Sequence, residues 1–452
     1  MSAIVETRGV TQQAATWLPL LKDNELDRPF AHREGRTVSV REFLADVQSI
    51  VMQLPSASHA VNLCEDRYHF FASFCAVVLA GQTNLLPPSR APQAIADVMH
   101  AHPNSYAIAD SVREVEPPRL FRLPALVGRA RGGERVPSLM ADHRVAIGFT
   151  SGSTGHPKPN PKHWRAVCAS SARNVALLGA LDRAVTIVAT VPPQHMYGLE
   201  MSVLLPLCSR AVIDASLPFF PADIAQALAR VDAPRILVTT PFHLRALLQS
   251  DVALPDVETV VSATAPLDAE LARAIENRFA THVVEVFGST ETCVIAHRRT
   301  ALDEPWHLYD GVRLHPQPDG TLVEADYFET STLLQDLVEL DGDRRFVLRG
   351  RNGDLLDIAG KRASLGDLNH RLLAIDGVRD GIMFALDADA KGVQRLAALV
   401  VADTLSETDI VDRLRREIDP VFLPRVVRIV TALPRNATGK LPREALLAAL
   451  RA

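Results

Sequence analysis

Between about Val145 and Phe287 the sequence alternates short apolar runs with longer stretches in which apolar residues recur every three or four positions. Short runs rich in β-branched residues are typical of buried strands, and the wider spacing is typical of amphipathic helices. Because strands that alternate with helices form parallel sheets covered on both faces, we predict an α/β fold with mainly parallel, helix-covered sheets. The predicted strands are 145–149, 185–191, 235–240, 257–263 and 282–287, and the predicted helices are Trp164–Leu181, Ala222–Val231 and Asp268–Phe279.

The regions before and after this part differ in their predicted elements and in their content of charged residues. Upstream, helix-like patterns at 40–54 and 68–80 surround a strand-like run at 60–63, so we place this region in one large N-terminal domain, residues 1–349. After Arg349 the chain becomes a more charged α+β segment, with strand-like runs at 382–386 and 396–401 and a helix-like run at 407–418. Turn-forming and charged residues at 349–354 predict a boundary there, and hence a small C-terminal domain over 350–452.

Composition narrows the class of protein. The 452 residues are 47% hydrophobic and 22% charged with a net charge of −5, which favours a globular protein and argues against a broad surface for DNA or anionic membranes. The five cysteines are scattered and never spaced CxxC, so neither a disulfide framework nor a structural zinc site is predicted. No signal peptide or membrane span is recognisable, and we expect a cytoplasmic protein.

The most informative segment for chemistry is FTSGSTGHPK at 149–158, directly after a predicted strand. Glycines allow successive backbone N–H groups to converge on an anion, hydroxyls add donors and lysine adds a charge, so the segment predicts a polyphosphate cradle. It is neither a GxxxxGK[ST] loop nor a GxGxxG fingerprint, and by itself it also fits a Ser/Gly-rich surface loop. The phosphate-binding candidates are Thr150, Ser151, Gly152, Ser153, Thr154, Gly155 and Lys158.

Five further segments follow this loop in order. They are PPQHMYGL at 192–199, SATAPL at 262–267, VFGSTE at 286–291, GRNGDLLDIAGKR at 350–362 and LPRNATGKLPR at 433–443. With the loop, this ordered set resembles the motifs of the adenylate-forming superfamily, which includes acyl- and aryl-CoA synthetases, peptide-synthetase adenylation domains and firefly luciferase. The resemblance implies a large ATP-binding domain followed by a small, mobile α+β lid domain.

The resemblance also implies where the nucleotide binds. Phe287 stacks on the purine with Ala265 facing it, and Glu291 holds Mg²⁺ against the triphosphate through a hard oxygen ligand. Taken singly, the phenylalanine fits a core residue and the glutamate fits a surface acid that opens a helix. The residues implied for adenine and AMP are Ala263, Thr264, Ala265, Phe287, Gly288 and Thr290, and those implied for the ribose hydroxyls are Asp336 and Arg351.

The catalytic groups are carried over in the same way. Lys440 bridges the carboxylate and the α-phosphate, where a fixed cation helps most in the transition state, and Lys158 supports the phosphates. His195 lies beside the carboxylate that is activated, and on its residue type alone it also fits a buried core histidine. The hinge position is Gly353, and the implied acid pocket is His195, Met196, Tyr197, Ala265 and Gly288.

The substrate is predicted from what the acid motif lacks. Peptide-synthetase domains use an aspartate there to hold an amino group, whereas this motif has no acid before Glu200. We therefore expect an uncharged acyl or aryl acid, favouring an aryl acid such as 4-hydroxybenzoate, with medium- or long-chain fatty acids as the alternative. The thiol acceptor is CoA or the phosphopantetheine arm of an acyl carrier protein.

Three departures from the family pattern motivate a rival from another class, a non-catalytic paralogue that binds nucleotide or acyl groups. The usual GDL triplet reads QDL at 335–337, the hinge acid or lysine is Gly353, and a GE-rich motif is not recognisable between Glu291 and Asp336. Retention of Lys158, Glu291, Asp336, Arg351 and Lys440 together favours the enzyme.

Overall fold

The computed structural model describes residues 16–126, 135–151, 157–351, 355–358, 361–386, 395–436 and 441–452. The chain divides into two compact units. The first unit comprises residues 1–185 and 193–216, and the second comprises 186–192 and 217–452. Among the described residues, no helix is both long enough and apolar enough to cross a membrane.

The first unit is built on a six-stranded sheet in the order β10-β9-β5-β4-β6-β7. Its parallel members are β4 (His59–Asn62), β5 (Thr83–Leu86), β6 (Ser105–Ala109), β7 (Leu120–Arg122) and β9 (Arg144–Ser151), and β10 (Pro157–His163) runs antiparallel to β9. Apolar side chains of β4, β5, β6 and β9 pack with α3 (Pro92–Ala101) in one core. The apolar runs of the sequence thus become fully buried parallel strands, as expected.

Helices and short strands complete the first unit. α2 (Arg67–Leu79) follows β4, and α4 (Trp164–Leu177) follows β10. Two further groups of strands are paired. β2 (Pro29–Arg33) pairs with β3 (Arg36–Ser39) and β12 (Val212–Asp214), and β1 (Trp17–Pro19) pairs with β8 (Ser138–Met140). The remaining elements are α1 (Val40–Val51), α5 (Met196–Leu199), the π-helical turn η1 (Glu200–Leu204) and α6 (Leu205–Leu207).

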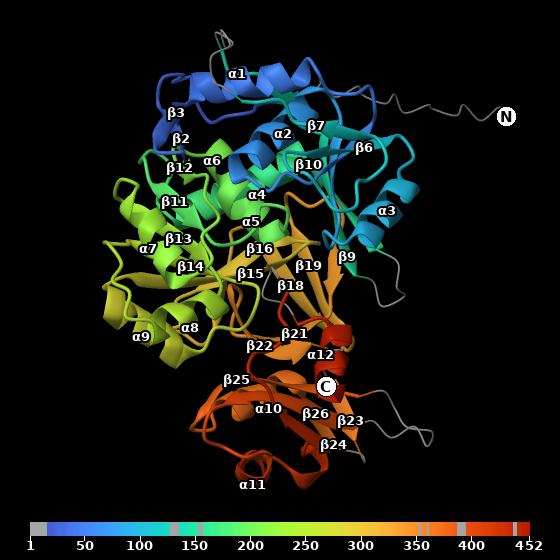
Figure 1. Cartoon of the computed structure of the whole chain (residues 1–452), viewed down its shortest axis with the longest axis vertical. Helices are drawn as coiled ribbons and strands as arrows, with labels where there is room; N and C mark the ends of the chain where they lie inside the picture. The colour runs from blue at the N-terminus through green and yellow to red at the C-terminus, as the bar shows by residue number, and fades with distance from the viewer. Residues whose placement is uncertain are drawn as a thin grey trace, which may run out of the picture. The chain divides into compact units, whose positions relative to one another are not determined.

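The second unit contains the strand series β21-β22-β17-β16-β15-β14-β13-β11. β11 (Thr186–Ala189), β13 (Arg235–Thr239), β14 (Thr259–Ser262) and β15 (His282–Ser289) are parallel, and α7 (Pro221–Ala229), α8 (Pro241–Gln249) and α9 (Ala269–Phe279) pack their apolar faces on these strands (Figure 1). β16 (Cys293–Arg298), β17 (Trp306–Leu308), β21 (Asp336–Leu340) and β22 (Arg345–Arg351) continue the series antiparallel. β18 (Val312–Gln317), β19 (Gly320–Ala325) and β20 (Thr332–Leu334) form a separate antiparallel sheet.

The C-terminal part of the second unit has its own core. β25 (Val378–Ala385), β26 (Leu396–Ala402) and β27 (Val426–Ile429) form a sheet whose apolar faces pack against α10 (Leu365–Leu373), α11 (Glu407–Glu417), η3 (Pro420–Phe422) and α12 (Arg443–Arg451). β23 (Leu355–Ile358) and β24 (Lys361–Ser364) form a hairpin. This is the predicted α+β texture, and the fold class is confirmed. The predicted boundary at Gly350 lies within the second unit, and the division into domains 1–349 and 350–452 stays a prediction.

Candidate active site

The VFGSTE segment lies where β15 ends and reverses into β16, the position at which a parallel sheet presents ligand-binding residues. A bulge falls between Phe287 and Gly288, and a Cβ added at Gly288 would lie 2.2 Å from the carbonyl oxygen of Cys293. Only glycine allows the two backbones to approach this closely. The ring of Phe287 is half-buried and packs on Trp306 and Phe346, with centroid distances of 5.4 and 5.7 Å.

The turn after this bulge is held by hydroxyl groups. Ser289 Oγ accepts hydrogen bonds from the backbone N–H groups of Glu291 and Thr292, each at 3.2 Å, and Cys293 adopts a left-handed φ of 61°. The chain therefore enters β16, and Glu291 does not open a helix. Glu291 and Thr290 are half-buried.

The SATAPL segment forms the turn after β14, the parallel neighbour of β15. Thr264 has a φ of 78°, a costly value for a residue with a branched side chain, and Thr264 and Ala265 are exposed while Ala263 is buried. The strain persists because the end of the turn is tied down: the Leu267 N–H donates to Glu285 Oε1 at 3.0 Å.

Glu285 is a site residue that the sequence reasoning missed. The residue is 3% exposed, and its carboxylate also accepts hydrogen bonds from Arg298 Nε at 2.8 Å and Thr300 Oγ1 at 2.7 Å. Burial raises the pKa of Glu285, an effect opposed by Arg298 and Thr300. The Arg298 guanidinium lies 4.4 Å from the centroid of Trp306, the ring that backs Phe287. Glu285 therefore connects the SATAPL turn to the aromatic group around Phe287. The sequence feature that could have revealed it is a single acid within the apolar run HVVEVF.

Asp336 and Arg351 are register partners on β21 and β22. Asp336 is buried, and its carbonyl oxygen accepts from Thr321 Oγ1 at 2.6 Å, which ties β21 to the neighbouring sheet. For Arg351 the structure describes the backbone position only. The backbones of the two predicted ribose residues thus lie next to each other on paired strands.

Glu291 can supply one of the oxygen ligands that a magnesium ion needs. Glutamate supplies a hard oxygen, but the described residues contain no group of three or more His, Cys, Asp or Glu side chains placed to hold a metal. Mg²⁺ commonly binds through one or two carboxylates and completes its octahedron with water and substrate phosphates. Glu291 would therefore hold the ion together with the triphosphate, and the ion would neutralise phosphate charge there.

The phosphate segment of the first unit connects β9 and β10. Lys158 lies opposite Thr150 in this hairpin and is exposed, and Asn160 Nδ2 donates to Lys158 O at 3.1 Å and to Thr150 Oγ1 at 3.4 Å. Ser151 is described by its backbone alone. Six predicted residues lie outside the described residues: Gly152, Ser153, Thr154, Gly155, Gly353 and Lys440.

The PPQHMYGL segment forms the start of α5, with half-buried His195 at the N-cap, half-buried Met196 and buried Tyr197. The next residues form the π-helical turn η1, a type of distortion that is common at functional sites. Glu200 is 1% exposed and accepts a hydrogen bond from Ser170 Oγ at 3.1 Å. Its carboxylate is thereby engaged in the interior of the first unit.

Two family models match the sequence. A model of AMP-binding enzymes covers residues 24–316, and a model of the C-terminal domain of AMP-binding enzymes covers residues 369–440. This chain belongs to the AMP-binding enzyme family. The predicted resemblance to adenylate-forming enzymes is thus confirmed.

The AMP-binding enzyme is similar to several CoA ligases. It is 31% identical to a 4-coumarate–CoA ligase of Rhodobacter capsulatus over 65% of this chain and 74% of that protein, and 26% identical to a sulfoacetate–CoA ligase of Cupriavidus necator over 75% of each. Its structure is similar to o-succinylbenzoate coenzyme A synthetase from Bacillus subtilis in complex with AMP, with a TM-score of 0.79, 17% identity and coverage of 95% and 98% of the two chains. The predicted enzyme class, an AMP-forming acid–thiol ligase, is confirmed.

Proposed function

We propose that this AMP-binding enzyme activates an aryl carboxylic acid with MgATP and transfers the acyl group to the thiol of CoA. In the first step a carboxylate oxygen attacks the α-phosphorus, an acyl-adenylate forms and pyrophosphate leaves. In the second step the thiol sulfur attacks the acyl carbonyl and AMP leaves. Positioning of the reactants and stabilisation of charge on the phosphates carry the first step.

The proposed binding of ATP is supported mainly by how the strands of the second unit are arranged. Phe287 and the SATAPL turn end neighbouring parallel strands, and one buried carboxylate, Glu285, links their supports. Asp336 and Arg351 share a register position on two further strands of the same series. Such a set supports an adenosine site with the purine against Phe287 and the ribose hydroxyls at Asp336.

The substrate class is inferred from the acid motif. Glu200 is engaged by Ser170 inside the first unit, so no acid of the 192–200 segment serves as partner for an amino group. Tyr197 and Met196 favour an uncharged ring such as that of 4-hydroxybenzoate, and the similarity to a 4-coumarate–CoA ligase supports an aryl acid. The small C-terminal domain, 350–452, acts as a lid that turns about Gly353 and brings Lys440 to the phosphates.

Isotope exchange between pyrophosphate and ATP tests the first step. We expect exchange that depends on an aryl acid and falls on the order of 10²–10³-fold in Lys440→Ala. A panel of hydroxybenzoates, cinnamates and fatty acids, followed by thioester formation with CoA or with a pantetheinylated carrier protein, identifies the acid and the acceptor. Binding of ATP without exchange for any acid in the panel would instead establish a non-catalytic nucleotide-binding protein.

A further inference from the structure

The Leu63–Arg67 turn, which follows β4 and includes the first residue of α2, connects to the PPQHMYGL segment in two ways, one direct and one through Ser202 of η1. Gln194 Nε2 donates to the carbonyl oxygen of Cys64 at 3.0 Å. At the other end of the turn, Arg67 Nη1 donates to Ser202 Oγ at 2.5 Å, and Ser202 Oγ donates to the carbonyl oxygen of Gly198 at 2.6 Å. The turn therefore holds the chain immediately before His195 and, through Ser202 of η1, at Gly198 of α5.

External anchors matter here because α5 is a very short element. It has four residues and continues into a π-helical turn, and an isolated turn of helix has little intrinsic stability. The positions of His195, Met196 and Tyr197 must therefore come from packing and from hydrogen bonds to other elements. Arg67 is 1% exposed, so its bond to Ser202 is formed away from water, where it is strongest.

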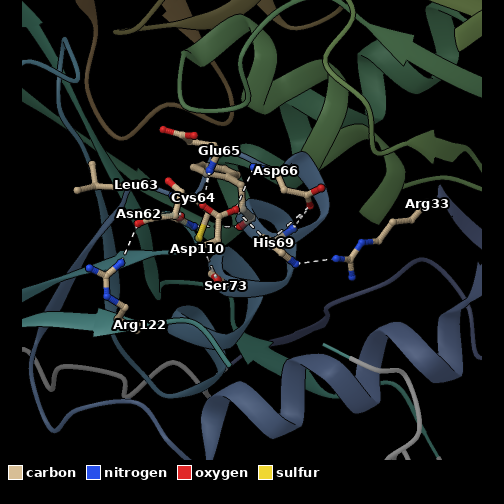
Figure 2. Close-up of polar contacts among 12 residues, drawn as sticks. Arg33, Asn62, Leu63, Cys64, Glu65, Asp66, His69, Ser73, Asp110 and Arg122 are labelled. Atoms are coloured by element: carbon tan, nitrogen blue, oxygen red, sulfur yellow. Dashed lines mark hydrogen bonds and ion pairs between the residues drawn. The ribbon is translucent and has the colours of Figure 1, made fainter. Parts of the chain in front are cut away.

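The turn itself is fixed by a partly buried polar network, shown in Figure 2. Asp110, which follows β6, accepts from the backbone N–H groups of Glu65 at 2.9 Å and Asp66 at 3.0 Å and from His69 Nδ1 at 2.9 Å. His69 Nε2 in turn accepts from Arg33 Nη2 at 2.8 Å.

Arg90 binds the other side of the turn, at its carbonyl groups. Arg90 Nη2 donates to the carbonyl oxygens of Leu63 at 2.5 Å and Cys64 at 2.7 Å. With its N–H groups bound by a carboxylate and its carbonyls bound by a guanidinium, the turn is held from both sides and provides a rigid support.

We propose that the Leu63–Arg67 turn is a positioning element of the acid site, acting through Gln194 and Ser202 on the segment that carries His195, Met196 and Tyr197. This inference rests on the proposed function, because those three residues are the proposed acid pocket. Arg67, Gln194 and Ser202 are positioning residues. They set where the acid is held, and the ATP site of the second unit does not depend on them.

The sharpest test compares two buried serines of the first unit. Ser202 and Ser209 are both fully buried, and each donates its hydroxyl to the carbonyl four residues earlier, at 2.6 and 2.8 Å. Only Ser202 also accepts from Arg67 and contacts α5. In Ser202→Ala the KM for the acid should rise about fivefold with the KM for ATP unchanged, whereas Ser209→Ala should leave both KM values unchanged at a comparable loss of thermal stability.

A second pair tests the other end of the segment. Gln194→Met removes the bond to Cys64 with little change in side-chain volume, and its control is Gln53→Met, because Gln53 Nε2 donates to the carbonyl of Ser49 at 2.9 Å in α1. The acid KM should rise severalfold in the first variant alone. Equal rises in the KM values for acid and ATP, or no rise in Ser202→Ala and Gln194→Met, would overturn the positioning role. If the wild-type enzyme shows no acid-dependent exchange, the proposed function fails and this inference fails with it.

Discussion

Asp336 and Arg351 lie directly opposite one another on the antiparallel strands β21 and β22. Asp336 is 5% exposed, and Thr321 Oγ1 fixes its backbone by donating to its carbonyl oxygen. A buried acid on a fixed strand is well placed to accept hydrogen bonds from two hydroxyl groups with little loss of conformational entropy on binding.

Replacement of Asp336 should weaken nucleotide binding selectively. Hydrogen bonds to a charged group contribute about 1.5–3 kcal/mol, so Asp336→Asn should raise the KM for ATP roughly ten- to a hundredfold with a small effect on the KM for the acid. Asp341→Asn is the control, because Asp341 lies one residue beyond β21 and pairs with exposed Arg345 on the surface. Steady-state kinetics on both variants checks the prediction, and equal ATP KM values for the two would contradict it.

Glu285→Gln should lower both stability and ATP binding. The change leaves Arg298 facing a neutral amide in a buried setting, and loss of one partner of a buried pair costs about 3–5 kcal/mol, so the melting temperature should fall clearly. The KM for ATP should rise because the SATAPL turn and Trp306 lose their shared support.

The matched control for Glu285 is Glu276→Gln. Glu276 Oε1 also accepts from an arginine, Arg299 Nη2 at 2.7 Å, and from a backbone N–H, that of Val283 at 2.8 Å, but it does not touch the SATAPL turn. It should lose stability without a change in the KM for ATP. A parallel rise in that KM in both variants would mean that Glu285 acts through stability alone.

Gly288→Ala should disrupt the end of β15. The added Cβ would meet the backbone of Cys293 at 2.2 Å, and backbone cannot move aside without breaking the β15–β16 pairing. Overpacking of this kind costs about 1–3 kcal/mol or more. Gly381→Ala is the comparison, because its Cβ would come closest to a side-chain atom, Leu372 Cδ2 at 3.0 Å, and the nearest backbone atom, the carbonyl oxygen of Leu399, would lie at an ordinary contact distance of 3.5 Å. Thermal melts and ATP titrations should separate the two, and intact ATP binding in Gly288→Ala would refute the close-approach argument.

Asp110→Asn should lose stability in a pH-dependent way. Burial alone would raise the pKa of Asp110, but hydrogen bonds from His69 and from the backbone of Glu65 and Asp66 lower it to about 2. A carboxyl whose pKa is lower in the folded state stabilises the protein above its unfolded pKa, near 3.8, and this contribution fades as the pH falls towards 2. Urea unfolding should therefore show a larger difference between wild type and Asp110→Asn at pH 7 than at pH 3, and an equal difference at both would argue against the ionised network.

Local sequence determined the longer helices and the buried parallel strands that apolar spacing predicted. The predicted helix at Trp164–Leu181 is found at Trp164–Leu177, and the predicted strand 282–287 is found as His282–Ser289, because apolar spacing and turn-forming residues act over a few neighbours. The ordered motifs likewise identified the family. Ends of elements shifted by a few residues, since they depend on partners such as β16, whose backbone fixes the bulge at Gly288.

Tertiary structure alone decided which groups support the candidate site. Glu285 reads in sequence as a charge within an apolar strand, and only folding brings it to Leu267, Arg298 and Thr300. In the same way Gln194 reaches Cys64 and Asp110 reaches His69 across long stretches of chain. Spacing along a chain encodes contacts within one element, whereas contacts between distant segments follow from how strands order in a sheet and where their ends meet.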